Sequence, residues 1–114
     1  MRHRHVVYLI FAAVATLGTL LAAPVQADET GFAAMHAVRK ERGRICMSDH
    51  YHYGSGTGAT KQAALASAIQ AWSSFTDFEY GSTWASFKRA AGKSVSYSAS
   101  SGGWSADISA RACK

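Results

Sequence analysis

The clearest chemical pattern in the sequence is a pair of histidines two positions apart, His50 and His52. Side chains two apart on a β-strand project to the same face, so both imidazoles can approach one metal ion. If the last strand of the chain pairs beside them, Asp107 adds a carboxylate oxygen, and this donor set suits Zn(II) or Cu(II). The alternative is a partly solvated polar sheet face, because two histidines specify a metal only weakly.

The two cysteines, Cys46 and Cys113, are expected to form a disulfide bond. An even number of cysteines in an exported small domain most simply forms intramolecular bridges, and only one pairing is possible here. The bridge would close most of the chain into a single loop and stabilise a domain too small to bury a large core.

The first 27 residues have the pattern of a secretory signal. Arg2 and Arg4 precede an apolar stretch at 6–23, and small residues at 25–27 form a cleavage site. A retained membrane anchor is the alternative, although Thr and Gly residues interrupt the apolar stretch. We expect cleavage after Ala27, which gives an exported protein, periplasmic or secreted, with no membrane span after the signal is removed.

The mature chain is mildly basic. Removing Arg2 and Arg4 from the twelve Lys and Arg leaves ten, against seven Asp and Glu, so its charge is +3. This charge and the predicted export argue against a nucleic-acid partner. One short run of closely spaced basic residues could bind an anionic envelope surface by electrostatic attraction. The alternative is that this run is simply a solvated segment. The cations of this run are Arg39, Lys40, Arg42 and Arg44.

Hydrophobic periodicity and breaker residues divide the mature chain into a few elements. Thr60 can cap a helix whose apolar stripe consists of Leu65, Ala68, Ile69, Trp72 and Phe75. Between Asp28 and Lys114 aromatic residues outnumber Val, Ile and Leu by 11 to 6, so the three tryptophans, Trp72, Trp84 and Trp104, are expected in the core. The expected elements are an arm or short helix at 28–43, then, within a disulfide-stapled domain at 44–114, a strand at 44–53, a helix at 61–78, a short helix at 82–91 and hairpin strands at 95–99 and 104–112.

These elements predict an α+β domain with a three-stranded antiparallel sheet, packed on one face by the long helix. The final strand lies in the centre, so the strand order is first, third, second. Pairing Cys46 opposite Cys113 fixes a register that places His52 opposite Asp107. The same register points Asp49 into the core, which indicates a bulge or a wrong register.

The glycine-rich segment 54–58 is expected to be a flexible turn before the helix. Its spacing formally fits a relaxed dinucleotide fingerprint, but the chain is too short for the parallel sheet that such a site needs. Backbone amides at Gly56 and Gly58, with Thr60, could still receive a sulfate, phosphate or carboxylate at the helix N-terminus. A turn that binds nothing is the alternative.

Three segments resemble a family of small exported bacterial proteins of unknown function: CMSDHYHYG at 46–54, AWSSFTDFEYG at 71–81 and ARAC at 110–113. The resemblance covers most of the mature chain. It implies a second cysteine pair in relatives where this chain has Tyr97 and Ala106, and those positions are opposed in the predicted hairpin. It implies no activity.

No nucleophile-elbow pattern such as Gly-x-Ser-x-Gly occurs, so we expect no enzyme. The sequence thus predicts a non-enzymatic exported domain with a binding or structural role in the cell envelope or exterior. Weak Zn or Cu binding through the histidine pair is the alternative function.

Overall fold

The computed structural model describes residue 18 and residues 28–114, and the rest of the predicted signal sequence lies outside them. No helix within these residues combines the length and the apolar character needed to cross a bilayer. The elements are η1 (Ala33–Met35), β1 (Val38–Glu41), β2 (Arg44–Met47), β3 (His52–Gly58), α1 (Lys61–Tyr80), η2 (Ser82–Trp84), η3 (Phe87–Arg89), β4 (Ala91–Ser100) and β5 (Gly103–Arg111).

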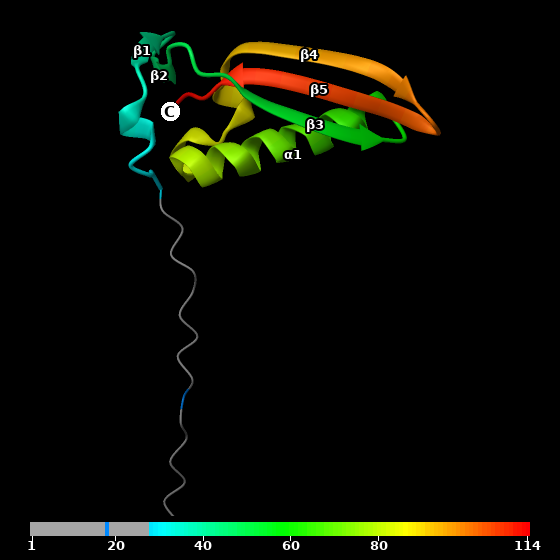
Figure 1. Ribbon diagram of the computed structural model, residues 1–114, viewed down its shortest axis with the longest axis horizontal. Coiled ribbons are helices and arrows are strands. Elements are labelled where there is room, and N and C mark those ends of the chain that lie inside the picture. The colour runs from blue at the N-terminus through cyan, green and yellow to red at the C-terminus, as the bar shows by residue number, and fades with distance from the viewer. Residues whose placement is uncertain (1–17, 19–27) are drawn as a thin grey trace, which may run out of the picture.

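Two antiparallel sheets and one long helix form the domain (Figure 1). The α+β class and the three-stranded antiparallel sheet are confirmed, with order β3-β5-β4; β1 and β2 form a separate hairpin. Tyr97 lies opposite Ala106 in the β4–β5 hairpin, so its predicted register is confirmed. The helix packs mainly against β3 and β5 and leaves residues 92–100 of β4 exposed, so its cover of the sheet face is less complete than predicted.

Helix α1 begins where the sequence predicts. The side chain of Thr60 accepts a hydrogen bond from the Ala63 amide, which satisfies one of the free N–H groups of the first turn. The chain leaves the helix at Gly81, whose φ of 102° lies in a region that favours glycine. Ala68 and Trp72 of the expected stripe are buried, whereas its other members are not. The buried residues recur every fourth position and are Ala64, Ala68, Trp72, Thr76 and Tyr80.

Glycines in β3 explain this shift of the helix face. Segment 54–58 is a strand rather than a flexible turn, and its glycines face the helix. A Cβ placed on Gly54 would lie 2.3 Å from the Ala68 carbonyl oxygen, and one on Gly56 would lie 2.4 Å from the Ala68 amide nitrogen. The helix backbone therefore lies directly on the strand backbone, so small residues line the contact and Leu65 and Ile69 move to its sides.

The disulfide between Cys46 and Cys113 is confirmed, but the register it fixes extends only a short distance. The Met47 amide donates to the Ala112 carbonyl, in agreement with the prediction, whereas His52 lies opposite Ala110. Between these two pairs, four residues (48–51) on one strand stand against a single residue, Arg111, on the other. The first strand therefore carries three extra residues at this point, an insertion relative to the predicted register. An odd insertion exchanges the two faces of the following strand.

This insertion explains why the predicted strand at 44–53 is divided into β2 and β3. Asp49, which the predicted register pointed into the core, lies exposed within the insertion. His52, predicted on the wet face, is instead 2% exposed. The sequence-based pairing of His52 with Asp107 is therefore wrong, because Asp107 lies opposite Ser55.

Two segments contain no α-helix, one predicted as an arm or short helix and the other as a short helix. Residues 28–43 form the single turn η1 and the strand β1, and Met35 is 77% exposed. The short helix predicted at 82–91 is replaced by η2 and η3, two turns of 3-10 helix. Trp72 and Trp84 are buried as predicted, whereas Trp104 is partly buried beneath the Lys61 ammonium, 4.6 Å from its ring centre.

Candidate functional site

Three histidines and one carboxylate meet near the C-terminal end of α1. His36 lies between η1 and β1, His50 lies in the insertion before β3, and Glu79 lies in the last turn of the helix. One potential ligand atom from each of these three lies within 4.8 Å of the others. His52, the first residue of β3, lies beside them, with its ring centre 5.3 Å from that of His50.

The His52 ring is held on several sides in the core. Its Nδ1 lies 2.8 Å from the Thr76 hydroxyl, and that hydroxyl donates to the Trp72 carbonyl oxygen. Tyr80 stacks on the ring with centres 4.7 Å apart. Nε2 lies 2.9 Å from Glu79 Oε2 but is misaligned for a hydrogen bond, and no other described residue supplies a partner. Burial lowers the pKa of His52, against the raising effect of the Glu79 charge.

The other two histidines are more open to solvent. His36 Nδ1 donates to the Phe32 carbonyl oxygen at 2.9 Å, one helical turn earlier in the chain. The rings of His36 and His50 meet edge to face with centres 4.6 Å apart. His50 Nε2 lies 3.9 Å from Glu79 Oε1, and its side chain is 45% exposed.

The structure does not bring together the metal ligands predicted from sequence. His50 and His52 are close, but Asp107 is exposed on the opposite sheet face, where the Ser55 hydroxyl donates to it at 2.5 Å. Glu79 and His36 lie beside the histidines instead, and sequence analysis named neither as a candidate ligand. His36 is the one other histidine in residues 28–114, so its residue type was the only available signal.

The predicted anion site in the glycine segment is also not formed. Gly56 and Gly58 lie in β3 against the helix backbone, and the Thr60 side chain already accepts from the helix. These glycines therefore belong to an extended strand and not to a turn at the helix N-terminus, which the predicted site required.

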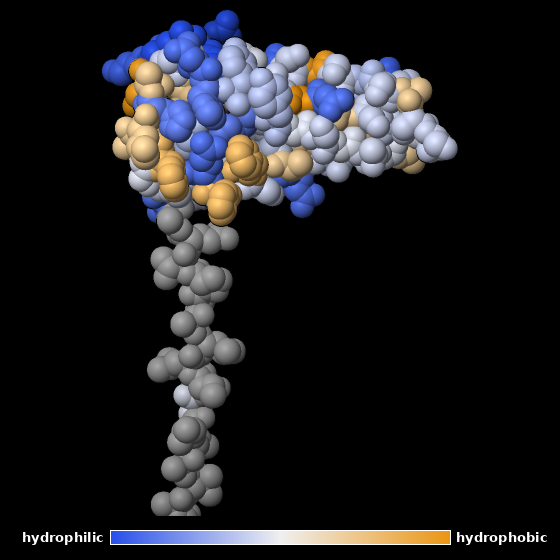
Figure 2. Space-filling model, viewed as in Figure 1, coloured by the Kyte–Doolittle hydropathy of each residue, from blue (hydrophilic) through white to orange (hydrophobic). Residues whose placement is uncertain are grey.

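A second concave site lies beside the disulfide. It is an open cleft of about 740 Å³. Figure 2 shows strongly hydrophilic residues over β1 and β2, which form one of its walls. The cleft is lined by Glu41, Arg42, Arg44, Ala90, Ala91, Gly92, Lys93 and Arg111.

An ion pair forms the base of this cleft. The Arg111 guanidinium donates to both carboxylate oxygens of Glu41, with Nη2 2.8 Å from Oε1, and to the Met47 carbonyl oxygen at 2.7 Å. Hydrogen bonding to Arg111 lowers the pKa of Glu41 to about 2, and the same contact raises the pKa of Arg111. The pair connects β1, which contains Glu41, to the end of β5, which contains Arg111.

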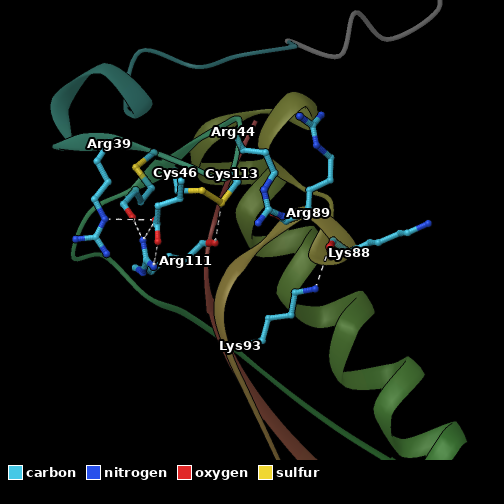
Figure 3. The surroundings of a disulfide bond; sticks show 10 residues. Arg39, Arg44, Cys46, Lys88, Arg89, Lys93, Arg111 and Cys113 are labelled. Carbon is cyan, nitrogen blue, oxygen red and sulfur yellow. Dashed lines mark hydrogen bonds and ion pairs between the residues drawn. A yellow bond between two sulfur atoms is a disulfide. The ribbon is translucent and has the colours of Figure 1, made fainter.

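The remaining cations of the cleft are not neutralised by carboxylates. Among residues 28–114, no acidic group lies within ion-pair distance of Arg42, Arg44 or Lys93. Arg44 donates to the Arg89 carbonyl, and Lys93 donates to the Lys88 carbonyl at 2.9 Å. Figure 3 shows Arg44 and Lys93 in the surroundings of the disulfide, although they come from distant parts of the sequence.

The four cations predicted to meet an anionic surface are divided by the hairpin. Arg42 and Arg44 line the cleft, whereas Arg39 lies 3.4 Å from Glu41 and Lys40 is exposed outside it. Lys93 joins the first two from β4, 49 positions after Arg44 in the chain. Sequence analysis therefore identified two of the four cationic lining residues, Arg42 and Arg44, and missed Lys93 and Arg111.

Comparisons with known protein families, with curated proteins and with solved structures found no match to this chain.

Proposed function

We propose that this protein is a non-enzymatic exported domain that binds anionic groups of the cell envelope or exterior through the cleft beside its disulfide. The observation that carries the proposal is the convergence of Arg42, Arg44 and Lys93 on one concave surface without a carboxylate to neutralise them among the described residues. Cations held close together in this way create a positive potential that attracts phosphate or carboxylate groups.

The cleft is also organised to keep its shape. Arg111 is 5% exposed and is hydrogen-bonded to Glu41 and Met47, so its role is to fix the wall rather than to bind a ligand. The disulfide lies beside Arg111, with Cys113 Sγ 3.8 Å from the Arg111 carbonyl oxygen (Figure 3). Because the wall is already fixed before a ligand binds, its side chains lose less conformational entropy on binding. Export of the protein and an oxidising location are parts of the proposal and are supported by the disulfide.

The experiment is co-sedimentation of the oxidised protein with isolated cell wall and with lipid vesicles, either anionic or zwitterionic. Binding to an anionic surface at low salt that weakens at high salt is the expected result. Absence of binding to every surface at low salt would contradict the proposal. Equal binding to zwitterionic vesicles would also contradict it, because the cationic cleft would then play no role.

A matched pair of single-charge variants locates the binding surface. Arg42→Gln removes one cation from the cleft, and Lys61→Gln removes one exposed cation at the start of α1. We expect the first change to weaken binding about fivefold, since a basic residue near an anionic surface contributes about 1 kcal/mol. The second change should have a clearly smaller effect. Equal effects would show that net charge alone matters.

A further inference from the structure

The Nε2 atom of His52 is buried beside Glu79 without a hydrogen-bond partner among the described residues. The Thr76 hydroxyl already donates to the Trp72 carbonyl, so it accepts from His52, and Nδ1 must carry the ring proton. The other ring nitrogen then presents a lone pair 2.9 Å from a carboxylate oxygen. Two electron-rich atoms at this distance repel each other unless a proton or a cation lies near both.

The hydrogen bond of His36 points to the same chemistry. A carbonyl oxygen can only accept a hydrogen bond, so the 2.9 Å contact with the Phe32 carbonyl places the His36 ring proton on Nδ1. The lone pair of Nε2 is then available to a metal ion. Histidines that ligate metals almost always donate their second ring N–H to a backbone carbonyl, a carboxylate or water. His36 has a backbone carbonyl as its outer partner, and His52 has the Thr76 hydroxyl in the same place.

We propose that His36, His50 and Glu79 bind a divalent transition-metal ion, Zn(II) or Cu(II). The buried Nε2 of His52 is the fourth ligand and approaches the ion from the protein interior. Three imidazole nitrogens and one carboxylate oxygen form a donor set that both ions accept. Among the four groups, only His50 is largely exposed, so it gives the ion access from solvent.

The spacing of the groups is compatible with this site. Ligands at about 2.0–2.2 Å from a tetrahedral ion lie roughly 3.4 Å apart. The ligand atoms of His36, His50 and Glu79 already lie within 4.8 Å of one another, and His52 Nε2 lies 2.9 Å from Glu79 Oε2, so among the three outer residues the largest gap to close is about 1.4 Å. The bound ion would connect the insertion at 48–51 and the segment before β1 to the end of α1.

The test is titration of the oxidised protein with ZnCl2 and, separately, with CuCl2, followed by calorimetry. In the zinc titration, NMR of the imidazole nitrogens should show shifts at His36, His50 and His52. Replacing an outer partner of a metal ligand typically weakens binding about 10–100-fold, so loss of a ligand in His50→Gln or Glu79→Gln should weaken it at least tenfold. Asp107→Asn, which removes a carboxylate on the opposite sheet face, should leave the affinity unchanged.

Three results would overturn the site. One is an absence of imidazole shifts at about 1 mM Zn(II) together with an absence of heat from either ion. Another is equal weakening by Asp107→Asn and Glu79→Gln. The third is unchanged affinity in His50→Gln, a variant that retains the fold because the side chain is exposed. Circular dichroism of each variant separates loss of a ligand from loss of structure.

Discussion

Substitution of Gly56 by alanine tests the close contact between α1 and β3. The new Cβ would lie 2.4 Å from the Ala68 amide nitrogen and 2.7 Å from the Ala64 carbonyl oxygen, whereas ordinary contact begins at 3.4 Å. Both neighbours are helix backbone, so the helix must move by about 1 Å. Overpacking of this kind typically costs about 1–3 kcal/mol.

Urea denaturation of the oxidised protein measures this cost. For a domain of this size the free energy of unfolding changes by about 1 kcal/mol per M of urea, so the midpoint should fall by about 2 M. Gly31→Ala is the control, because no atom lies within 4 Å of its added Cβ and its φ is not positive. That variant should stay within about 0.5 kcal/mol of the parent. A midpoint for Gly56→Ala within 0.5 M of the parent would refute the packing argument.

Three further variants or conditions address the bridge, the ion pair and the helix cap. The bridge between Cys46 and Cys113 spans 67 positions, so its reduction should lower the free energy of unfolding by about 4 kcal/mol; a reduced protein with an unchanged melting temperature would contradict this. The Glu41 carboxyl has a pKa of about 2 instead of 4.5, because it is hydrogen-bonded to Arg111, so its stabilisation is complete above pH 4.5 and is lost as pH falls towards 2. Melting temperatures of Glu41→Gln should lack this acid-dependent decrease. Thr60→Ala should cost about 1 kcal/mol in urea denaturation, and a loss below about 0.3 kcal/mol would argue against the cap.

The elements set by local sequence were predictable. Thr60 and Gly81 mark the ends of α1 because capping and positive φ depend on a few adjacent residues. The β4–β5 hairpin follows from alternation on both sides of a short turn, and the pairing of Tyr97 with Ala106 needs no distant information. The disulfide was predictable because only two cysteines exist.

The errors come from contacts between distant segments. A disulfide fixes register only near itself, and the insertion at 48–51 changes it by three positions. The parity of every later residue in β3 then reverses, which moves His52 from the wet face to the core. The glycines of β3 were equally ambiguous, because glycine favours turns and also permits close backbone contact.

The candidate sites were predictable only in part for the same reason. The histidine pair and the run from Arg39 to Arg44 are visible as local patterns. Their partners Glu79 and Lys93 lie on other elements, and nothing in their immediate neighbours distinguishes them from ordinary solvated charges. Only the fold brings them to the histidines and to the cleft.

The segment 103–114 takes part in both sheets, and this has a consequence for the order of folding. Residues 103–111 form the central strand between β3 and β4, and residues 112–114 pair with β2. During synthesis from the N-terminus, neither β2 nor β3 can pair with this segment before residues 103–114 are available. The long-range β pairing that joins the two sheets is therefore expected to form last, after the helix and the β1–β2 hairpin have all their residues.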